Sequence, residues 1–263
     1  MTTLGTEELR GRLDVATDVA RLAGKLTLEW FRTSGLEVDT KADGTPVTMA
    51  DKAAERLIRE HLTRRFPDDG IVGEEEDDVA GTSGLRWVID PIDGTKAFTH
   101  GVPLYSTLLA LLDGDGHPVL GVVDLPALGE TASAARGVGC WLTRAGGAPE
   151  RTTVSTTDVI GGSWAMTSGL TPWDLAAVER LKAAGVHLRT WGDAYGYVLV
   201  ATGRADAMID PIAELWDLAA PAVVVTEAGG RFTATDGTPG PAAGSGIGSN
   251  GRVHDALIDL LGG

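Results

Sequence analysis

The stretch WVIDPIDGTKAF, residues 87–98, places two aspartates at the end of an apolar run and then breaks the chain with Gly-Thr. The apolar residues predict a buried strand that delivers Asp90 at its end. Pro91 fixes φ and prevents further sheet pairing, so Asp93 is expected in the turn that follows. Two carboxylates are therefore expected within four residues of each other at the end of one strand.

The residues after these aspartates predict a seat for phosphate. Gly94 lets the backbone approach a ligand, and Thr95 begins a helix whose first N–H groups are free. Carboxylates would repel a phosphate there unless a divalent cation lay between them, and Mg²⁺ prefers oxygen ligands. The alternative interpretation is structural, with Asp90 as a turn residue and Asp93 as a helix N-cap. The strand-to-helix context favours the functional interpretation.

A covalent mechanism is disfavoured by the spacing of the two aspartates. Phosphatases of the haloacid dehalogenase type use Asp-x-Asp-Gly-Thr, in which the first aspartate is the nucleophile. This chain has Asp-Pro-Ile-Asp-Gly-Thr, which is one residue longer. In a strand, residues i and i+2 share a side, whereas residues i and i+3 do not.

Three further acidic residues are candidates only in combination. Glu74 follows a short predicted strand and could face the same metal, although GEEEDD alone is typical of a solvated, mobile acidic loop over 75–84. Asp217 opens a predicted helix and could be its N-cap. Asp51 stands three residues after Thr48 and could be a first-turn acid in a capping box.

Composition bounds the function. The chain has 263 residues, of which 43% are hydrophobic, and its formal net charge is −15, so it lacks the basic footprint of a nucleic-acid binder. No apolar run reaches the roughly 18 residues of a membrane span, and the polar N-terminus is no signal peptide. The single cysteine, Cys140, allows no internal disulfide and fits a reducing compartment, the cytoplasm.

Hydrophobic patterning predicts two different halves. Helices are expected over 7–32 and from Thr48 to about Arg65, with a polar loop before the second. A meander of largely antiparallel strands follows from 85 onward, in the segments LRWVID, STLLALL, PVLGVVDLP, ETASAA and GCWLT. After about residue 150 strands and helices alternate.

These patterns predict two lobes and one irregular glycine-rich segment. We expect an N-terminal α+β lobe over 1–150, with the metal and phosphate motifs, and a C-terminal α/β lobe over 151–263. The division is expected near 145–155. GSGIGSNG at 244–251 is interpreted as a loop and an edge strand.

GEE at 73–75, WVIDPIDGT at 87–95 and WD at 216–217 occur in this order, and the combination resembles the inositol monophosphatase-like family of magnesium-dependent, lithium-sensitive phosphatases. VTMADKAAE, LVATGRADAMID and VVVTEAGG extend the resemblance over nearly the whole chain. It implies a layered αβαβα sandwich of the inositol monophosphatase and fructose-1,6-bisphosphatase type, with the site between the lobes. It also implies a homodimer.

The resemblance implies a site for two or three Mg²⁺ ions, with Mn²⁺ as a possible substitute. Its ligands would be the Glu74, Asp90, Asp93 and Asp217 carboxylates and the Ile92 carbonyl. Gly94 and Thr95 would offer backbone N–H groups to the phosphate. Asp51 and Thr95 would form a hydrogen-bonded pair near the attacking water, which Glu74 would help to deprotonate.

Within the family, RTWGDAYGYVLVATGRADAMIDP at 189–211 resembles the histidinol-phosphate phosphatase branch. Asp210 falls where the family holds an acid that contacts substrate, and Asp193 replaces a small residue common in inositol phosphatases. Two carboxylates suit a substrate with a cationic amine and an imidazole that can protonate. The alternative for Asp193 is a helix cap.

The expected reaction is hydrolysis of a phosphate monoester, with L-histidinol phosphate converted to L-histidinol in histidine biosynthesis. An inositol monophosphate, a sugar phosphate or a nucleoside 3′,5′-bisphosphate remains an alternative substrate. A catalytically inactive regulator that binds metal or phosphoester is the alternative of another class. The ligand set that the resemblance implies argues against that regulator. The expected partner is a small-molecule phosphate ester, not a nucleic acid or a membrane.

Overall fold

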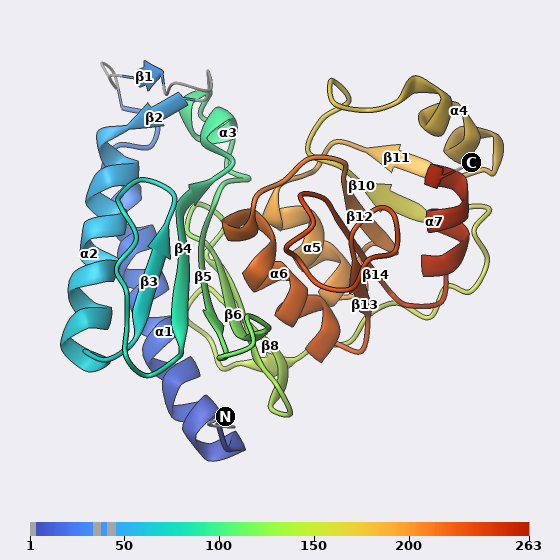
Figure 1. The fold of residues 1–263 in the computed structure, drawn as a ribbon. Coiled ribbons are helices and arrows are strands. Elements are labelled where there is room, and N and C mark those ends of the chain that lie inside the picture. The colour runs from blue at the N-terminus through green and yellow to red at the C-terminus, as the bar shows by residue number, and fades with distance from the viewer. Residues whose placement is uncertain (1–3, 34–37, 41–45, 263) are drawn as a thin grey trace.

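The computed structural model of the protein describes residues 4–33, 38–40 and 46–262. These residues stack in five layers of helix, sheet, helix, sheet and helix (Figure 1). The outer layers are α1 (Thr6–Thr27) with α2 (Met49–Arg65), and α4 (Leu175–Ala183) with α7 (His254–Gly262). The central layer is α5 (Ala194–Ala201) with α6 (Leu215–Glu227). The predicted αβαβα architecture is confirmed.

The first sheet follows chain order. Its seven strands in the described residues are β3 (Gly70–Gly73), β4 (Arg86–Asp93), β5 (Ser106–Leu112), β6 (Pro118–Leu125), β7 (Glu130–Ala135), β8 (Gly139–Arg144) and β9 (Glu150–Arg151). β3 and β4 are parallel, and every later neighbouring pair is antiparallel, so the predicted meander is confirmed.

One detail of β4 differs from the expectation. The strand does not end at Pro91 but continues to Asp93, which pairs with Ser106 of β5 after a register shift between Asp90 and Asp93. A proline cannot donate to the ladder, and an irregularity in the pairing accommodates it. Asp93 therefore sits at the end of the strand and not in the turn.

The two N-terminal helices cover one face of this sheet because their apolar stripes match it. Leu13 of α1 and Ile58 of α2 pack with Trp87 of β4 in one buried cluster. Thr48 caps α2 as predicted, since its Oγ1 accepts from the Ala50 N–H at 3.1 Å and the Asp51 carboxylate accepts from the Thr48 N–H at 2.7 Å.

The expected boundaries before α2 are partly wrong. α1 ends at Thr27, five residues before the predicted end at 32. Two short antiparallel strands, β1 (Val38–Thr40) and β2 (Pro46–Thr48), occupy part of the predicted polar loop. Residues 41–45 of that loop lie outside the described residues.

The central helices are apolar on both sides because they lie between two sheets. Val198 of α5 packs in the cluster beneath the first sheet, and its neighbours Tyr197 and Leu199 pack toward the second. An apolar surface all round is typical of such a buried helix. No helix among the described residues is long and apolar enough to cross a membrane.

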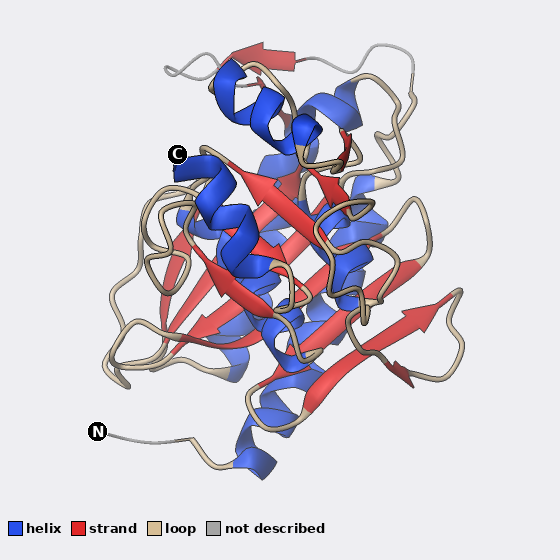
Figure 2. Ribbon diagram, turned by 90° about the vertical axis from the view of Figure 1, so that its right-hand side faces the viewer, coloured by secondary structure: helices blue, strands red, loops and turns tan. Residues whose placement is uncertain are grey.

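The second sheet has the order β11-β10-β12-β14-β13. Its strands are β10 (Trp164–Met166), β11 (His187–Arg189), β12 (Ala207–Asp210), β13 (Arg231–Thr233) and β14 (Gly246–Ser249). β10 is parallel to β11 and to β12, whereas β14 is antiparallel to both of its neighbours. Figure 2 looks onto the outer layer, with α7, the helix at the C label, in front of this sheet.

The prediction for 244–251 was wrong in one respect. β14 is not an edge strand, because it lies between β12 and β13. A Cβ at Gly248 would come within 2.8 Å of the Tyr197 ring, and one at Gly246 within 2.7 Å of the Tyr197 hydroxyl. Glycine is therefore required for close packing of α5 on an inner strand.

Candidate active site

The predicted residues gather where strands of both sheets end. β3 and β4 finish beside Glu74 and Asp93, and β12 finishes at Asp210. The short helix α3 (Thr95–Thr99) follows β4, and α5 begins one residue after Asp193. The carboxyl ends of strands are the common position of ligand sites in sheets with parallel pairs.

Three of the predicted metal ligands share one small space. Carboxylate oxygens of Asp90, Asp93 and Asp217 all lie within 4.8 Å of one another. Asp90 and Asp93 are buried, and Asp217 is half-buried. Glu74 lies close enough to add to their electrostatics, since its charge is among the causes, after burial, that raise the pKa of Asp90 and of Asp217.

The electrostatics of this cluster call for a cation. Burial first, and then the neighbouring carboxylates, raise the pKa of Asp90 and of Asp93 well above the ordinary value. The same causes raise the pKa of Asp217 to about 6. Asp90 Oδ1 is buried and has no hydrogen-bond partner among the described residues. An all-oxygen set with an unsatisfied ligand atom fits a hard divalent cation.

Asp217 is held by its own helix. Glu214 is the N-cap of α6, and the Asp217 carboxylate accepts from the Glu214 N–H at 2.7 Å. The N-cap interpretation of Asp217 is therefore wrong, because the residue occupies the third helical position. This position orients one carboxylate oxygen toward the helix start and presents the side chain to the cluster.

The turn after the cluster has the predicted backbone. Gly94 adopts φ 80°, in the left-handed region, and precedes Thr95 at the start of α3. The Thr95 hydroxyl donates to the Ile92 carbonyl at 3.0 Å. This contact joins two of the predicted site residues, the carbonyl and the hydroxyl.

The predicted hydrogen bond between Asp51 and Thr95 is absent. One Asp51 oxygen, Oδ2, accepts from the Thr48 N–H and from the Thr48 hydroxyl at 2.6 Å, so the capping box takes it. Asp51 Oδ1 is buried without a hydrogen-bond partner in the described part of the chain. Asp51 still lies near the cluster, since the Glu74 charge is among the causes that raise its pKa, after burial.

The second group of carboxylates adjoins the first. A Cβ on Gly94 would come within 2.9 Å of Asp193 Oδ2, so this side chain lies against the Gly94 backbone. Asp193 stands at the N-cap position of α5 with φ 54°, but its side chain makes no capping hydrogen bond. The alternative interpretation of Asp193 as a helix cap is therefore wrong.

Ser168 is a site residue that the sequence did not reveal. Its hydroxyl donates to Asp210 Oδ1 at 2.6 Å and accepts from the Asp193 N–H at 2.9 Å. Burial first raises the pKa of Asp210 to about 7, and the Asp193 charge adds to this. The available signal was its position two residues after β10, which runs parallel to β12.

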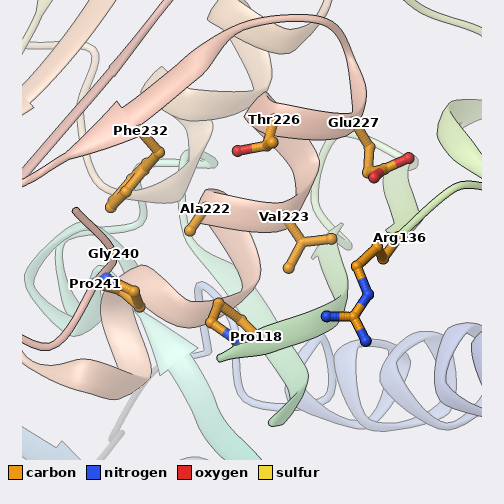
Figure 3. Close-up of a pocket in the computed structure, with 9 residues that line it drawn as sticks. All are labelled: Pro118, Arg136, Ala222, Val223, Thr226, Glu227, Phe232, Gly240 and Pro241. Atoms are coloured by element: carbon orange, nitrogen blue, oxygen red, sulfur yellow. The ribbon is translucent and has the colours of Figure 1, made fainter. Parts of the chain in front are cut away.

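A separate cavity of about 230 Å³ lies far from this cluster (Figure 3). Thr226 and Glu227 line it at the C-terminal end of α6, whereas Asp217 lies near the N-terminal end. Ten residues of helix separate Asp217 from Glu227, which is about 15 Å along the axis. The lining is mostly apolar, and the Glu227 carboxylate accepts hydrogen bonds from the N–H groups of Gly137 and Gly139.

The clustered carboxylates beside a glycine turn define the class of a metal-dependent enzyme that acts on phosphate esters. A family model described as the inositol monophosphatase family matches residues 8–261. The chain is 43% identical to a histidinol-phosphatase of Streptomyces coelicolor over 95% of this chain and 96% of that protein. It is 41% identical to a histidinol-phosphatase of Mycobacterium tuberculosis over 95% and 97%.

Solved structures agree with the sequence relatives. The IMPase of Thermotoga maritima superposes with a TM-score of 0.84 at 31% identity and covers 96% of this chain and 97% of that chain. The chain belongs to the inositol monophosphatase family, and it is a phosphoric monoester hydrolase.

Proposed function

We propose that the chain is a Mg²⁺-dependent phosphatase that converts L-histidinol phosphate to L-histidinol. The observation that carries this proposal is the pair Asp193 and Asp210, joined through Ser168, directly beside the Asp93 cluster. Relatives named histidinol-phosphatase at 41–44% identity support it.

Glu74, Asp90, Asp93, Asp217 and the Ile92 carbonyl would hold two or three Mg²⁺ ions. Their oxygen-only chemistry and the unpartnered Asp90 Oδ1 fit these ions, and Mn²⁺ suits the same ligands. When bound, the ions supply charge neutralisation for the phosphate and lower the pKa of the attacking water.

The residues around the cluster would position the ester and accept the proton. The Gly94 and Thr95 N–H groups would bind phosphate oxygens, because the left-handed turn at Gly94 leaves room for a close approach. Glu74 would accept the proton of the attacking water. Asp51 Oδ1, which is free of partners in the described residues, would accept a further hydrogen bond at that water.

Asp193 and Asp210 would bind the cationic part of the substrate. A buried carboxylate gains most from a partner that is itself charged, and Asp210 is buried while Asp193 is half-buried. The amine and imidazole of histidinol phosphate supply such partners, whereas the hydroxyls of a polyol do not. The Ser168 hydroxyl joins the Asp210 carboxylate to the backbone N–H of Asp193, which ties the start of α5 to the end of β12.

A panel of phosphate esters tests the substrate. Phosphate release from histidinol phosphate, inositol 1-phosphate, a sugar phosphate and a nucleoside 3′,5′-bisphosphate would be measured with Mg²⁺ and with chelator. We expect histidinol phosphate to have the highest kcat/KM. A higher kcat/KM for inositol phosphate would overturn this choice, and release that ignores Mg²⁺ would overturn the metal. A regulator would release no phosphate from any ester.

We also propose that the chain is a homodimer and works in the cytoplasm. Exposed aromatic and basic side chains on the β10–β11 edge support a self-association surface: Trp164 stacks with Trp191 at 6.4 Å between ring centroids, and the Arg189 guanidinium lies 5.0 Å from the Trp164 ring. Light scattering on the purified chain would report the mass, and a monomer would contradict the dimer. The single cysteine supports a reducing compartment.

We propose that residues 1–150 and 151–263 are the two lobes of the enzyme. The strands of the first sheet end at Arg151, and those of the second begin at Trp164, which supports a division in this region. Limited proteolysis that cuts first within 145–163 would agree with it.

A further inference from the structure

Two side chains of α2 grip the backbone that follows Glu74. The Glu55 carboxylate accepts from the Glu75 N–H at 2.9 Å and from the Glu76 N–H at 3.2 Å. The Arg59 guanidinium donates to the carbonyls of Glu76, at 2.8 Å, and Asp77, at 3.0 Å. These four hydrogen bonds fix the first part of the predicted mobile loop. We call this pair of side chains the Glu55–Arg59 clamp.

The clamp is buried and internally paired. Glu55 is 0% exposed and Arg59 is 8% exposed, and the Arg59 Nε donates to Glu55 Oε1 at 2.8 Å. A buried ion pair without further partners often adds no stability. Here each member makes two further hydrogen bonds to the loop backbone, so the arrangement specifies one loop position.

The clamp also touches the residue on the other side of Glu74. A Cβ at Gly73 would overlap Glu55 Oε1 and would lie 2.5 Å from Arg59 Nη2. Gly73 therefore allows the clamp to reach the loop, and Glu74 has its backbone fixed on both sides. The Glu74 N–H itself donates to the Ile89 carbonyl of β4 at 3.2 Å.

Apolar packing contributes little to the position of this segment. A cavity of about 490 Å³ lies between α2 and the loop, lined by Arg59, Thr63, Ile71, Glu75, Glu76, Asp77 and Val79. The loop thus spans an open, mostly polar space beside α2. Hydrogen bonds to the clamp, and not apolar packing, therefore hold the first residues of the loop in place.

We propose that Glu55 and Arg59 are positioning residues that hold Glu74 at the metal cluster and so set the affinity of the site for its divalent ion. This inference rests on the proposed role of Glu74 as a metal ligand. Groups that orient metal ligands without binding the metal themselves change metal affinity by about 10–100-fold when they are removed. The clamp acts through the backbone and lies outside the proposed ligand set.

The experiment measures Mg²⁺ affinity directly, by calorimetry and by the Mg²⁺-induced rise in Tm, in addition to kcat and KM. Glu55→Gln presents an amide donor to the loop N–H groups, and Arg59→Lys removes the fork that reaches two carbonyls. Gly73→Ala displaces the clamp without changing its chemistry. Glu60→Gln and Arg64→Lys are matched controls at exposed positions of the same helix.

We expect each clamp variant to bind Mg²⁺ about 10-fold or more weakly, with activity partly restored at high Mg²⁺, while the controls match the wild type. A folded clamp variant with wild-type affinity, even if its metal-free Tm is lower, would overturn the positioning role. If Glu55→Gln does not fold, the Mg²⁺ affinities of Arg59→Lys and Gly73→Ala test the positioning role.

A measurement without substitutions also decides. The Glu75 and Glu76 amides of the wild type should exchange slowly with solvent deuterium, and fast exchange would overturn the clamp. Failure of the proposed metal site can be distinguished from failure of the clamp, because the wild type itself would then show no Mg²⁺ binding.

Discussion

Asp93 accepts a hydrogen bond from the backbone N–H of Ala194, 101 residues later in the chain, at 2.8 Å. The same oxygen accepts from the Ser106 hydroxyl at 2.7 Å. The end of β4 is therefore joined to β5 and to the first residue of α5. One carboxylate links the acidic cluster of Asp90, Asp93 and Asp217 to the helix whose N-terminus carries Asp193.

Asp93→Asn should abolish most activity while the fold is retained. The Asn carbonyl oxygen can still accept from Ser106 and Ala194, but the charge that a cation needs is gone. We expect phosphate release to fall by about 100-fold or more, since the metal supplies several kcal/mol of charge stabilisation. Removing a buried, repelled charge should leave the metal-free Tm equal or higher.

The matched control for this substitution is Asp115→Asn. Asp115 belongs to an exposed cluster with Asp113 and His117 on a turn of the first sheet, where a charge change should leave turnover unaltered. Circular dichroism would confirm the fold of both variants. Normal turnover of Asp93→Asn would show that Asp93 holds no catalytic metal.

Mg²⁺ should stabilise the protein more at higher pH. The pKa of Asp217 is about 6 and that of Asp210 about 7, both above the ordinary 3.8. Folding therefore favours the protonated forms of Asp217 and Asp210. The stabilisation that these protonated carboxyls contribute to the free energy of unfolding is lost as pH rises through their pKa values. The proposed Mg²⁺ ions would bind the ionised carboxylates and therefore compete with protons.

The measurement is the Mg²⁺-induced rise in Tm at about pH 5.5 and about pH 8, on either side of these two pKa values. We expect the larger rise at the higher pH, and Asp217→Asn should weaken this dependence. An equal rise at both pH values would contradict the proposed link between the cluster and the ion.

Local sequence patterns predicted the strands and helices of both halves of the chain, whereas the five-layer arrangement was implied by the family resemblance. The apolar run before Asp90 indicates a buried strand, but Pro91 does not end it, since the strand continues to Asp93. Alternation after residue 150 indicates sheet with helices on both faces. The ligand set came from the resemblance and not from spacing alone.

The remaining features depend on contacts between distant segments. Ser168 joins Asp193 to Asp210 only after β10, β11 and β12 align, and no local pattern reports this. Asp51 could bond to Thr48 or to Thr95, and the nearer partner in the chain prevailed. The inner position of β14 depends on how closely Tyr197 approaches it.

Gly248→Ala should destabilise the protein by overpacking. The new Cβ would come within 2.8 Å of the Tyr197 ring, which is itself buried between the sheets. We expect a loss of about 1–3 kcal/mol in the free energy of unfolding, measured by urea denaturation. Gly262→Ala, at the end of α7, is the control, because nothing lies within 4 Å of its Cβ. A Gly248→Ala variant as stable as the wild type would mean that α5 packs less closely.

His254 should make the protein sensitive to acid. Its buried ring has both nitrogens in hydrogen bonds, to Ser249 at 2.8 Å and Thr233 at 2.9 Å. Burial first lowers its pKa from 6.5 to about 4. Below pH 6.5 the unfolded chain binds a proton at His254 that the folded chain does not bind. The contribution of the neutral ring to the free energy of unfolding is therefore complete above pH 6.5 and is lost as pH falls toward 4.

The loss is at most about 3 kcal/mol, from the size of the shift. It is measured as the difference in free energy of unfolding between the wild type and His254→Gln across this pH range. The difference should shrink as pH falls, with kcat unaffected because the residue lies in the outer layer. A constant difference would indicate that His254 does not resist protonation.

Asp210→Asn should change the substrate preference more than the chemistry. Asp210 is outside the metal cluster, and Ser168 holds it toward Asp193, so its charge is available to a cationic group of the ester. Losing one charge-assisted hydrogen bond costs about 1.5–3 kcal/mol. We therefore expect kcat/KM for histidinol phosphate to fall by roughly 10–100-fold, mainly through KM, and that for inositol phosphate to change by less than about 3-fold.

Asp158→Asn, at an exposed position of the same half of the chain, is the matched control for the loss of one negative charge. Steady-state kinetics with both esters at saturating Mg²⁺ separate the possible roles. Equal losses for the two esters would place Asp210 in support of the cluster and not in substrate choice. If both esters retain wild-type kinetics, the cationic group binds elsewhere, and the carboxylate pair no longer argues for histidinol phosphate.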